Sequence, residues 1–321
     1  MKQGDVLNGY RVVSRPTNAN AGKCLWAYAE KGGTEFFIKE FLEPKRLREG
    51  AMGSQEDQAR RRNECLRFEE RHRRVAKLLR PDDLHAGNLV LTVDFFAEGT
   101  RYYKVTRRVR AAEVAPHELP HRRQLVLLRT LADSLRLLHS HGIVHGDLKP
   151  DNVLLHQPPG SDLYVAKLID FDDAYRAGEA PSRETIGGDP RYGAPEWLRY
   201  LRGDPVRLDQ AADMFAFGLL AHTYLFGALP RHDERFDEPG SAVAAGAELI
   251  FDDRLSGRLA DLLVRLTAAD PRVRPDIATT ADVLSASLAS ESEPPGEVAT
   301  RTSRVKVNLG GRTSGRLRIN P

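Results

Sequence analysis

The chain has 321 residues, of which 41% are hydrophobic and 29% are charged, so it can form two packed lobes or two modest domains. Its net charge is only +3, and six basic residues but no acidic ones lie between Arg301 and Arg318, so the positive charge is concentrated in the tail. Two cysteines exclude a disulfide framework or a cysteine-based zinc site, and the N-terminus lacks an apolar signal region, which predicts a cytoplasmic protein with no membrane span.

Three short apolar segments, residues 10–13, 25–29 and 35–41, predict strands at the N-terminal end. Residues 14–23 connect the first two. This loop is composed of small and turn-forming residues that would let backbone N–H groups approach a phosphate. Gly22 is its only glycine, so it departs from a glycine-rich loop.

Residues 56–79 predict an arginine-rich helix with one apolar face, formed by Cys65, Phe68, His72, Val75, Ala76 and Leu79. Glu69 lies on the same side of this helix, and Glu64 is the alternative acidic residue. The arginines fit a solvated face with Arg/Glu pairs better than a nucleic-acid-binding surface.

The middle of the chain predicts two strands, a helix and a hairpin. The strands are residues 89–96 and 102–109, and leucines at 125, 128, 131, 135 and 138 predict an amphipathic helix over 121–141. Residues 153–155 and 164–169 predict a hairpin that brings Asn152 close to Asp170. Residues 205–289 are mainly helical in pattern, and the run 214–229 predicts a buried helix.

One short loop carries an unusual set of chemical groups, His145-Gly146-Asp147-Leu148-Lys149-Pro150-Asp151-Asn152. Asp170 follows it, at the end of an apolar run. Phosphoryl transfer needs a carboxylate that accepts a hydroxyl proton, an ammonium group near the transferred phosphoryl, and oxygen ligands for Mg²⁺. The loop and Asp170 supply all three.

This loop resembles the catalytic loop of eukaryotic-type serine/threonine protein kinases, a family also found in bacteria. Further segments resemble the family's motifs in the family's order: Phe37-Ile38-Lys39, Asp170-Phe171-Asp172, residues 188–196, residues 213–218 and residues 270–275. In the last of these, the resemblance implies that Arg274 pairs with Glu196.

The resemblance implies an α+β, bilobal protein-kinase-like fold, with a small antiparallel-sheet N-lobe and a larger, mainly helical C-lobe. The kinase domain would cover residues 1–289, with the N-lobe at about 1–108 and the C-lobe at about 109–289. Residues 290–321 form a linker and a basic tail, either disordered or a docking segment.

The implied activity is transfer of the γ-phosphoryl group of ATP to a protein hydroxyl, with Mg²⁺ or Mn²⁺. Asp147 would be the base and Lys149 would contact the γ-phosphate, while Asn152 and Asp170 would bind the metal. His145 would pack and hydrogen-bond within the loop.

Nucleotide binding would involve Lys39, which reaches the α- and β-phosphates, and Glu69, or alternatively Glu64, which pairs with Lys39. Gly22 would lie in the phosphate loop, and the adenine would bind backbone near residues 107–110.

Three departures from the family pattern stand out. Gly146 replaces an arginine that contacts a phosphorylated activation loop, which argues against activation by that route. Asp172 replaces a glycine and adds a carboxylate near the metal. Asp189 replaces a threonine, and one hypothesis is that it pairs with Lys149.

Two alternatives remain: a catalytically weak kinase-fold regulatory or scaffold module, and a small-molecule phosphotransferase, which also uses His-Gly-Asp. The expected partners are protein substrates, with no nucleic acid. The tail carries Thr300, Thr302, Ser303, Thr313 and Ser314 among arginines, so self-phosphorylation there is a further hypothesis.

Overall fold

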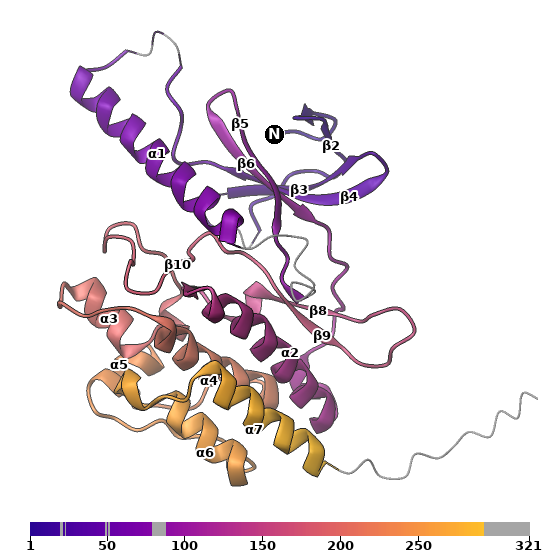
Figure 1. Ribbon diagram of the computed structural model, residues 1–321, viewed down its shortest axis with the longest axis vertical. Coiled ribbons are helices and arrows are strands. Elements are labelled where there is room, and N and C mark those ends of the chain that lie inside the picture. Colours follow the sequence, from indigo (N-terminus) through magenta and orange to yellow (C-terminus); the bar gives the residue numbers. More distant parts are fainter. Residues whose placement is uncertain (20–21, 23, 49, 51, 79–87, 292–321) are drawn as a thin grey trace, which may run out of the picture. The chain divides into compact units, whose positions relative to one another are not determined.

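The computed structural model describes residues 1–19, 22, 24–48, 50, 52–78 and 88–291 (Figure 1). Residues Met1–Ser290 form one compact unit. Asn20, Ala21 and Lys23 of the predicted phosphate loop, Leu79 of the predicted helix, and tail residues 292–321 lie outside the described residues.

A six-stranded antiparallel sheet forms the N-terminal part, in the order β1 (Val6–Leu7), β2 (Tyr10–Val12), β3 (Cys24–Lys31), β4 (Thr34–Phe41), β6 (Arg101–Arg107) and β5 (Thr92–Glu98). Gly32 and Gly33 have positive φ angles of 56° and 74°. They form the two-residue turn that joins β3 to β4. This kind of hairpin turn needs positive φ angles, which glycine adopts readily. The register places Lys39 of β4 opposite Lys104 of β6.

Helix α1 (Gln55–Leu78) lies alongside this sheet (Figure 1). The Ser54 hydroxyl accepts a hydrogen bond from the Asp57 backbone N–H, at 3.1 Å, near the start of the helix. The helix has acidic residues in its first turn and Lys77 in its last, which complements the helix dipole. Its apolar face packs on Phe41 and Tyr102 through Cys65 and Phe68.

The C-terminal part is built around α2 (His121–Ser140), which packs against α7 (Ile277–Ser290), α4 (Gln210–Phe226) and β9 (Val165–Leu168). The predicted leucine face of α2 is fully buried. The remaining helices and strands are β7 (Ile143–Val144), β8 (Val153–His156), β10 (Tyr175–Arg176), α3 (Pro195–Arg202), α5 (Pro239–Ala244) and α6 (Gly257–Leu266), with 3₁₀ turns at Pro116–Glu118, Pro150–Asn152, Pro190–Tyr192 and Pro271–Val273.

The expected α+β arrangement, a small antiparallel sheet followed by a mainly helical part, is therefore confirmed. The apolar run at residues 214–229 falls mostly in α4, which is buried as predicted. Asp209 caps the start of α4 by accepting from the Ala211 N–H at 3.0 Å. Among the described residues, no helix is long and apolar enough to cross a membrane.

A buried ion pair joins two distant segments of the C-terminal part. Arg274 Nη1 and Nη2 donate to the Glu196 carboxylate at 2.6 and 2.8 Å. Arg274 also donates to the carbonyls of Ala268 and Ala211. The predicted pairing of Arg274 with Glu196 is confirmed, and it ties α3 to the segment before α7.

Replacing Arg274 with methionine should lower the free energy of unfolding by about 3–5 kcal/mol, because the Glu196 carboxylate would be left buried without a cation. Denaturant unfolding of both proteins measures this change. Arg272→Met is a matched control, since Arg272 is 87% exposed, and it should not change the midpoint measurably. Equal shifts of the unfolding midpoint in the two variants would show that the buried pair contributes no more to stability than the exposed Arg272 does.

Candidate active site

The buried carboxylate of Asp213 accepts hydrogen bonds from the backbone of the loop that carries Asp147. The backbone N–H groups of His145 and Gly146 donate to Asp213 at 2.8 and 3.0 Å, and His139 Nε2 lies 3.0 Å from the same carboxylate. Burial would raise the pKa of Asp213, but His139 and His145 lower it below its ordinary value. Asp213 therefore stays ionised and sets the path of the loop.

Gly146 is required by this path. Its φ angle is +79°, and a Cβ atom at this position would lie 2.7 Å from the Asp173 carbonyl oxygen. An arginine at this position, which the resemblance led us to expect, could not adopt the same backbone without moving the segment after β9. The departure at residue 146 thus follows from close backbone packing.

Three predicted catalytic residues meet around one carboxylate. The Asn152 side-chain amide donates to the Asp147 backbone carbonyl at 2.7 Å and to Asp147 Oδ2 at 2.9 Å. Lys149 Nζ lies 2.9 Å from the same Oδ2. Asp147 Oδ1 is buried and has no hydrogen-bond partner among the described residues. One oxygen is thus held in place, and the other is available to accept a proton.

Lys149 also lies 3.7 Å from Asp189, so the hypothesised contact exists but is long. Asp189 is bound more closely by Arg191, at 2.9 Å, and by the Arg191 backbone N–H. Burial would lower the pKa of Lys149, but the hydrogen bond and charge of Asp147 raise it above its ordinary value. Lys149 therefore remains a cation beside Asp147.

The hairpin of β8 and β9 brings Asp170 to this loop, as predicted. The Ile169 N–H donates to the Asn152 carbonyl at 2.9 Å, and His145 Nε2 donates to the Ile169 carbonyl at 3.1 Å. Asp170 follows directly and has a φ angle of +57°, which is uncommon for a residue with a side chain. The expected hydrogen-bonding role of the buried His145 within the loop is confirmed.

Four charged side chains, here named the four-charge cluster, join the sheet to this segment: Lys39, Lys104, Asp170 and Asp172. Lys39 Nζ lies 2.9 Å from Asp170 Oδ2 and 2.6 Å from Asp172 Oδ2. Lys104 Nζ lies 2.8 Å from Asp170 Oδ1 and also bonds Asp172 Oδ1. Each ammonium group therefore bridges both carboxylates.

Both lysines are almost fully buried, with 9% and 5% exposure for Lys39 and Lys104. Burial would lower the pKa of Lys39, but Asp172 and Asp170 raise it above its ordinary value. Burial would raise the pKa of Asp172, but Lys104 and Lys39 hold it well below its usual range. Lys39 and Asp172 are thus held in their charged forms, and the formal charges of the cluster, from two lysines and two aspartates, sum to zero.

The sequence analysis did not identify Lys104. It lies within the run Tyr102-Tyr103-Lys104-Val105 of β6, whose other members are apolar or aromatic, in a chain with ten lysines and 38 arginines. A lone lysine in such a strand is a detectable signal. Its meaning depends on the register that places it opposite Lys39.

The predicted ion pair between Glu69 and Lys39 is not formed in this structure, which corrects that choice. Glu69 accepts from the Tyr102 hydroxyl at 2.8 Å and from Arg73 at 2.9 Å. The helix phase instead turns Phe68 and His72 toward the sheet, and His72 Nδ1 lies 3.7 Å from Asp172. The alternative, Glu64, is exposed.

Gly22 is exposed and has a φ angle of +53°, and a Cβ there would meet no atom within 4 Å. Its neighbours Ala21 and Lys23 lie outside the described residues. Thr17 and Trp26 pair across the base of the loop. The assignment of Gly22 to phosphate binding remains a prediction.

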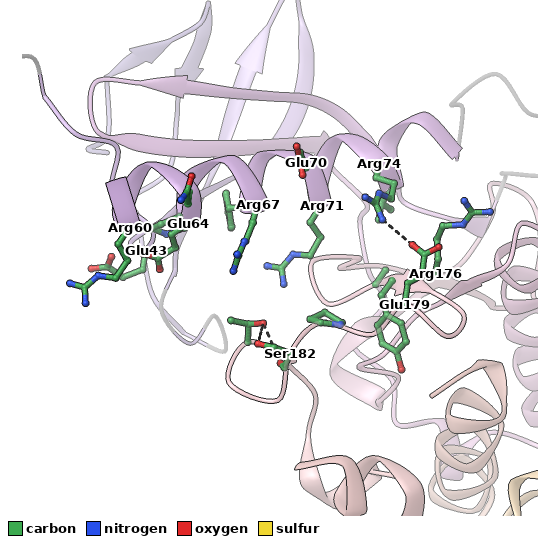
Figure 2. A pocket seen from close by; sticks show the side chains of 18 of the residues that line it. Glu43, Arg60, Glu64, Arg67, Glu70, Arg71, Arg74, Arg176, Glu179 and Ser182 are labelled. Atoms are coloured by element: carbon green, nitrogen blue, oxygen red, sulfur yellow. Dashed lines mark hydrogen bonds and ion pairs between the residues drawn. The ribbon is translucent and has the colours of Figure 1, made fainter. Parts of the chain in front are cut away.

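A cavity of about 1140 Å³ lies between α1 and residues 174–185. Figure 2 shows Arg67 and Arg71 reaching from α1 toward the segment that carries Ser182, while Arg74 pairs with Glu179. Ser182 and Thr185 are exposed and hydrogen-bond each other. The lining includes Glu64, the alternative partner predicted for Lys39, but not Lys39, Asp170 or any residue of the loop 145–152, so this cavity is separate from that loop.

Asp173, close to the site, has an unusually high pKa for a carboxyl group. Burial, together with the Asp172 and Asp147 charges, raises its pKa from 3.8 to about 6. The carboxyl group lies against Gly187, where a Cβ would come within 2.1 Å of it. The folded protein therefore holds this proton more tightly than an unfolded chain does.

The stability that protonated Asp173 contributes should be fully present below about pH 4 and lost as the pH rises through about 6. Asp173→Asn replaces the titrating carboxyl group with a neutral amide, so the variant does not lose this stability as the pH rises. The difference in free energy of unfolding between the variant and the wild type should therefore increase by about 2 kcal/mol between pH 4 and pH 7, in favour of the variant. Denaturant unfolding at several pH values measures the difference, and a difference that is constant with pH would contradict it.

Comparison with known proteins places these features in a family. The family model described as "Protein kinase domain" matches residues 40–284. The chain is 32% identical over 276 residues to the serine/threonine-protein kinase pkn2 of Myxococcus xanthus, covering 77% of this chain and 32% of that protein.

Two other relatives are a smooth-muscle myosin light chain kinase of Gallus gallus and the serine/threonine-protein kinase ULK3 of Xenopus laevis. They are 29% identical over 184 residues and 33% identical over 158 residues, which is 56% and 49% of this chain. The matches span 9% and 32% of those proteins, so the relatives are much longer than the matched segment. With a family model that matches most of its length, the chain belongs to the protein kinase domain family.

Proposed function

We propose that this protein is a serine/threonine protein kinase that transfers the γ-phosphoryl group of ATP to a protein hydroxyl. The observation that carries this proposal is the state of Asp147. One carboxylate oxygen is held by Asn152 and Lys149, and the other is buried with no partner among the described residues. A substrate hydroxyl is the kind of donor that fits the second oxygen.

Asp147 would orient the substrate hydroxyl and accept its proton as the phosphoryl group moves. The oxygen that Asn152 and Lys149 hold cannot rotate away, so the free oxygen stays aimed in one direction. Such preorganisation supports transfer because the reacting groups need little further ordering.

Asn152 and Asp170 are the residues that fit a divalent cation. Asn152 directs both amide hydrogen bonds at Asp147, which leaves its side-chain carbonyl oxygen as a ligand atom. Two protein ligands are enough for Mg²⁺, which binds few protein oxygens and completes its coordination with phosphates and water. When bound, the ion neutralises charge on the phosphate oxygens.

Lys39 and Lys149 supply the fixed positive charge. Lys39 would contact the α- and β-phosphates from β4, and Lys149 would contact the γ-phosphate beside Asp147. Carboxylates hold both ammonium groups in place in the structure. Neither lysine would therefore need a large movement to contact a phosphate oxygen. The names of the relatives pkn2 and ULK3 support a serine or threonine hydroxyl as acceptor.

Asp147→Asn should reduce transfer from γ-labelled ATP to a generic acceptor protein by about a thousandfold or more, because the proton acceptor is lost. Nucleotide binding, measured by calorimetry, should persist. Asp151→Asn is a matched control on the same loop, since Asp151 is exposed, and it should retain most of the activity.

Each other outcome of this experiment assigns a different function. Nucleotide binding without transfer by the wild-type chain would favour a regulatory or scaffold module. Transfer that requires a metabolite extract and labels no protein would favour a small-molecule phosphotransferase. Equal loss in both variants would show that Asp147 has no special role.

Chelation of divalent ions should abolish transfer, and Asp170→Asn should raise the Mg²⁺ concentration needed for half-maximal rate, because a charged ligand is replaced by a neutral one. A titration of rate against Mg²⁺ or Mn²⁺ measures both effects. Transfer that continues in excess chelator would contradict the metal assignment.

A further inference from the structure

Two members of the four-charge cluster, Lys104 and Asp172, have no role in the proposed function. They come from segments far apart in sequence, β6 and the residues after β9, and they bond each other directly. Asp172 also lies 2.6 Å from Lys39, which is closer than the 2.9 Å between Lys39 and Asp170. The carboxylate nearest to Lys39 is therefore Asp172.

Charge balance explains why Lys104 and Asp172 occur together. A carboxylate buried at this depth is strongly unfavourable unless a cation neutralises it. Lys39 alone would face the two carboxylates Asp170 and Asp172, leaving one negative charge in excess. Lys104 supplies the missing charge, and its position opposite Lys39 in the sheet places both ammonium groups on the same carboxylates.

Helix α1 supplies no carboxylate to Lys39. Glu69 is engaged by Tyr102 and Arg73. The residue of α1 nearest the cluster is His72, and burial lowers its pKa to about 3 although Asp172 opposes this, so it is neutral. The carboxylates that bind Lys39 thus both come from the segment after β9, and α1 supplies neither.

We propose that Asp172 and Lys104 are positioning residues of the nucleotide site. Asp172 fixes the Lys39 ammonium in place of a carboxylate from α1, and Lys104 balances Asp172 and orients Asp170. This inference rests on the proposed function, because it assigns Lys39 and Asp170 to nucleotide and metal. It also means that the position of Lys39 does not depend on where α1 lies.

A double-mutant cycle separates positioning from simple stability. Asp172→Asn and Lys104→Met each leave one unbalanced charge, whereas the double variant leaves Lys39 paired with Asp170 and is neutral. Each single variant should lower the melting temperature, and the double variant should recover most of that loss. The wild-type chain and all three variants are compared.

Nucleotide affinity, unlike stability, should not recover in the double variant. In Asp172→Asn and in the double variant, KM for ATP should rise about tenfold or more, because Lys39 has lost its closest carboxylate. The dissociation constant of ADP, measured in excess chelator, should rise in parallel. This second readout does not require metal or transfer. Glu70→Gln, an exposed change on α1, is the surface control and should alter neither value.

Three results would overturn the proposal. Full recovery of both stability and ADP affinity in the double variant would make the pair purely structural. Tighter ADP binding or faster transfer in Asp172→Asn would make the cluster an inhibitory latch. A loss in Glu69→Gln as large as that in Asp172→Asn would return the positioning role to α1.

The two proposals can fail separately. A wild-type chain that transfers no phosphoryl group would refute the proposed function alone. The ADP measurements would still support the positioning role if Asp172→Asn and the double variant bind more weakly while stability recovers in the double variant.

Discussion

The buried charge balance of the four-charge cluster is the constraint on which the site depends. Lys39, Lys104 and Asp172 are mostly buried and Asp170 is partly exposed, and removal of any one of the four would leave an unpaired charge. The cluster joins β4 and β6 to the segment after β9. It therefore sets the position of Lys39 and Asp170 with respect to the catalytic loop.

The catalytic loop obeys a second constraint, which is backbone hydrogen bonding to a buried carboxylate. Asp213 accepts from two successive N–H groups, and Gly146 makes the required turn against the Asp173 carbonyl. Asp147 is then held by Asn152 and Lys149. The departures at residues 146 and 172 are thus each matched by a neighbour: close packing at Gly146, and Lys104 beside Asp172.

Much of the fold could be predicted from local patterns. The leucine spacing of α2, the apolar run of α4 and the hairpin of β8 and β9 appear in the structure with shifts of a few residues, because periodicity reports burial directly. The pairing of Arg274 with Glu196 was also predictable, through resemblance. The choice of Glu69 was wrong for this structure, because helix phase alone does not decide which of several neighbouring side chains meets a given partner.

The sequence by itself determined the family, the loop 145–152 that we propose is catalytic, and the nearness of Asn152 to Asp170, since these depend on contiguous residues or on a short hairpin. Only the tertiary structure decided which groups surround Lys39. Lys104 lies 65 positions from Lys39 in the chain and meets it through strand register, and Asp172 meets both through the path after β9. Such contacts follow from how the sheet and the loop are packed together, which no local pattern encodes.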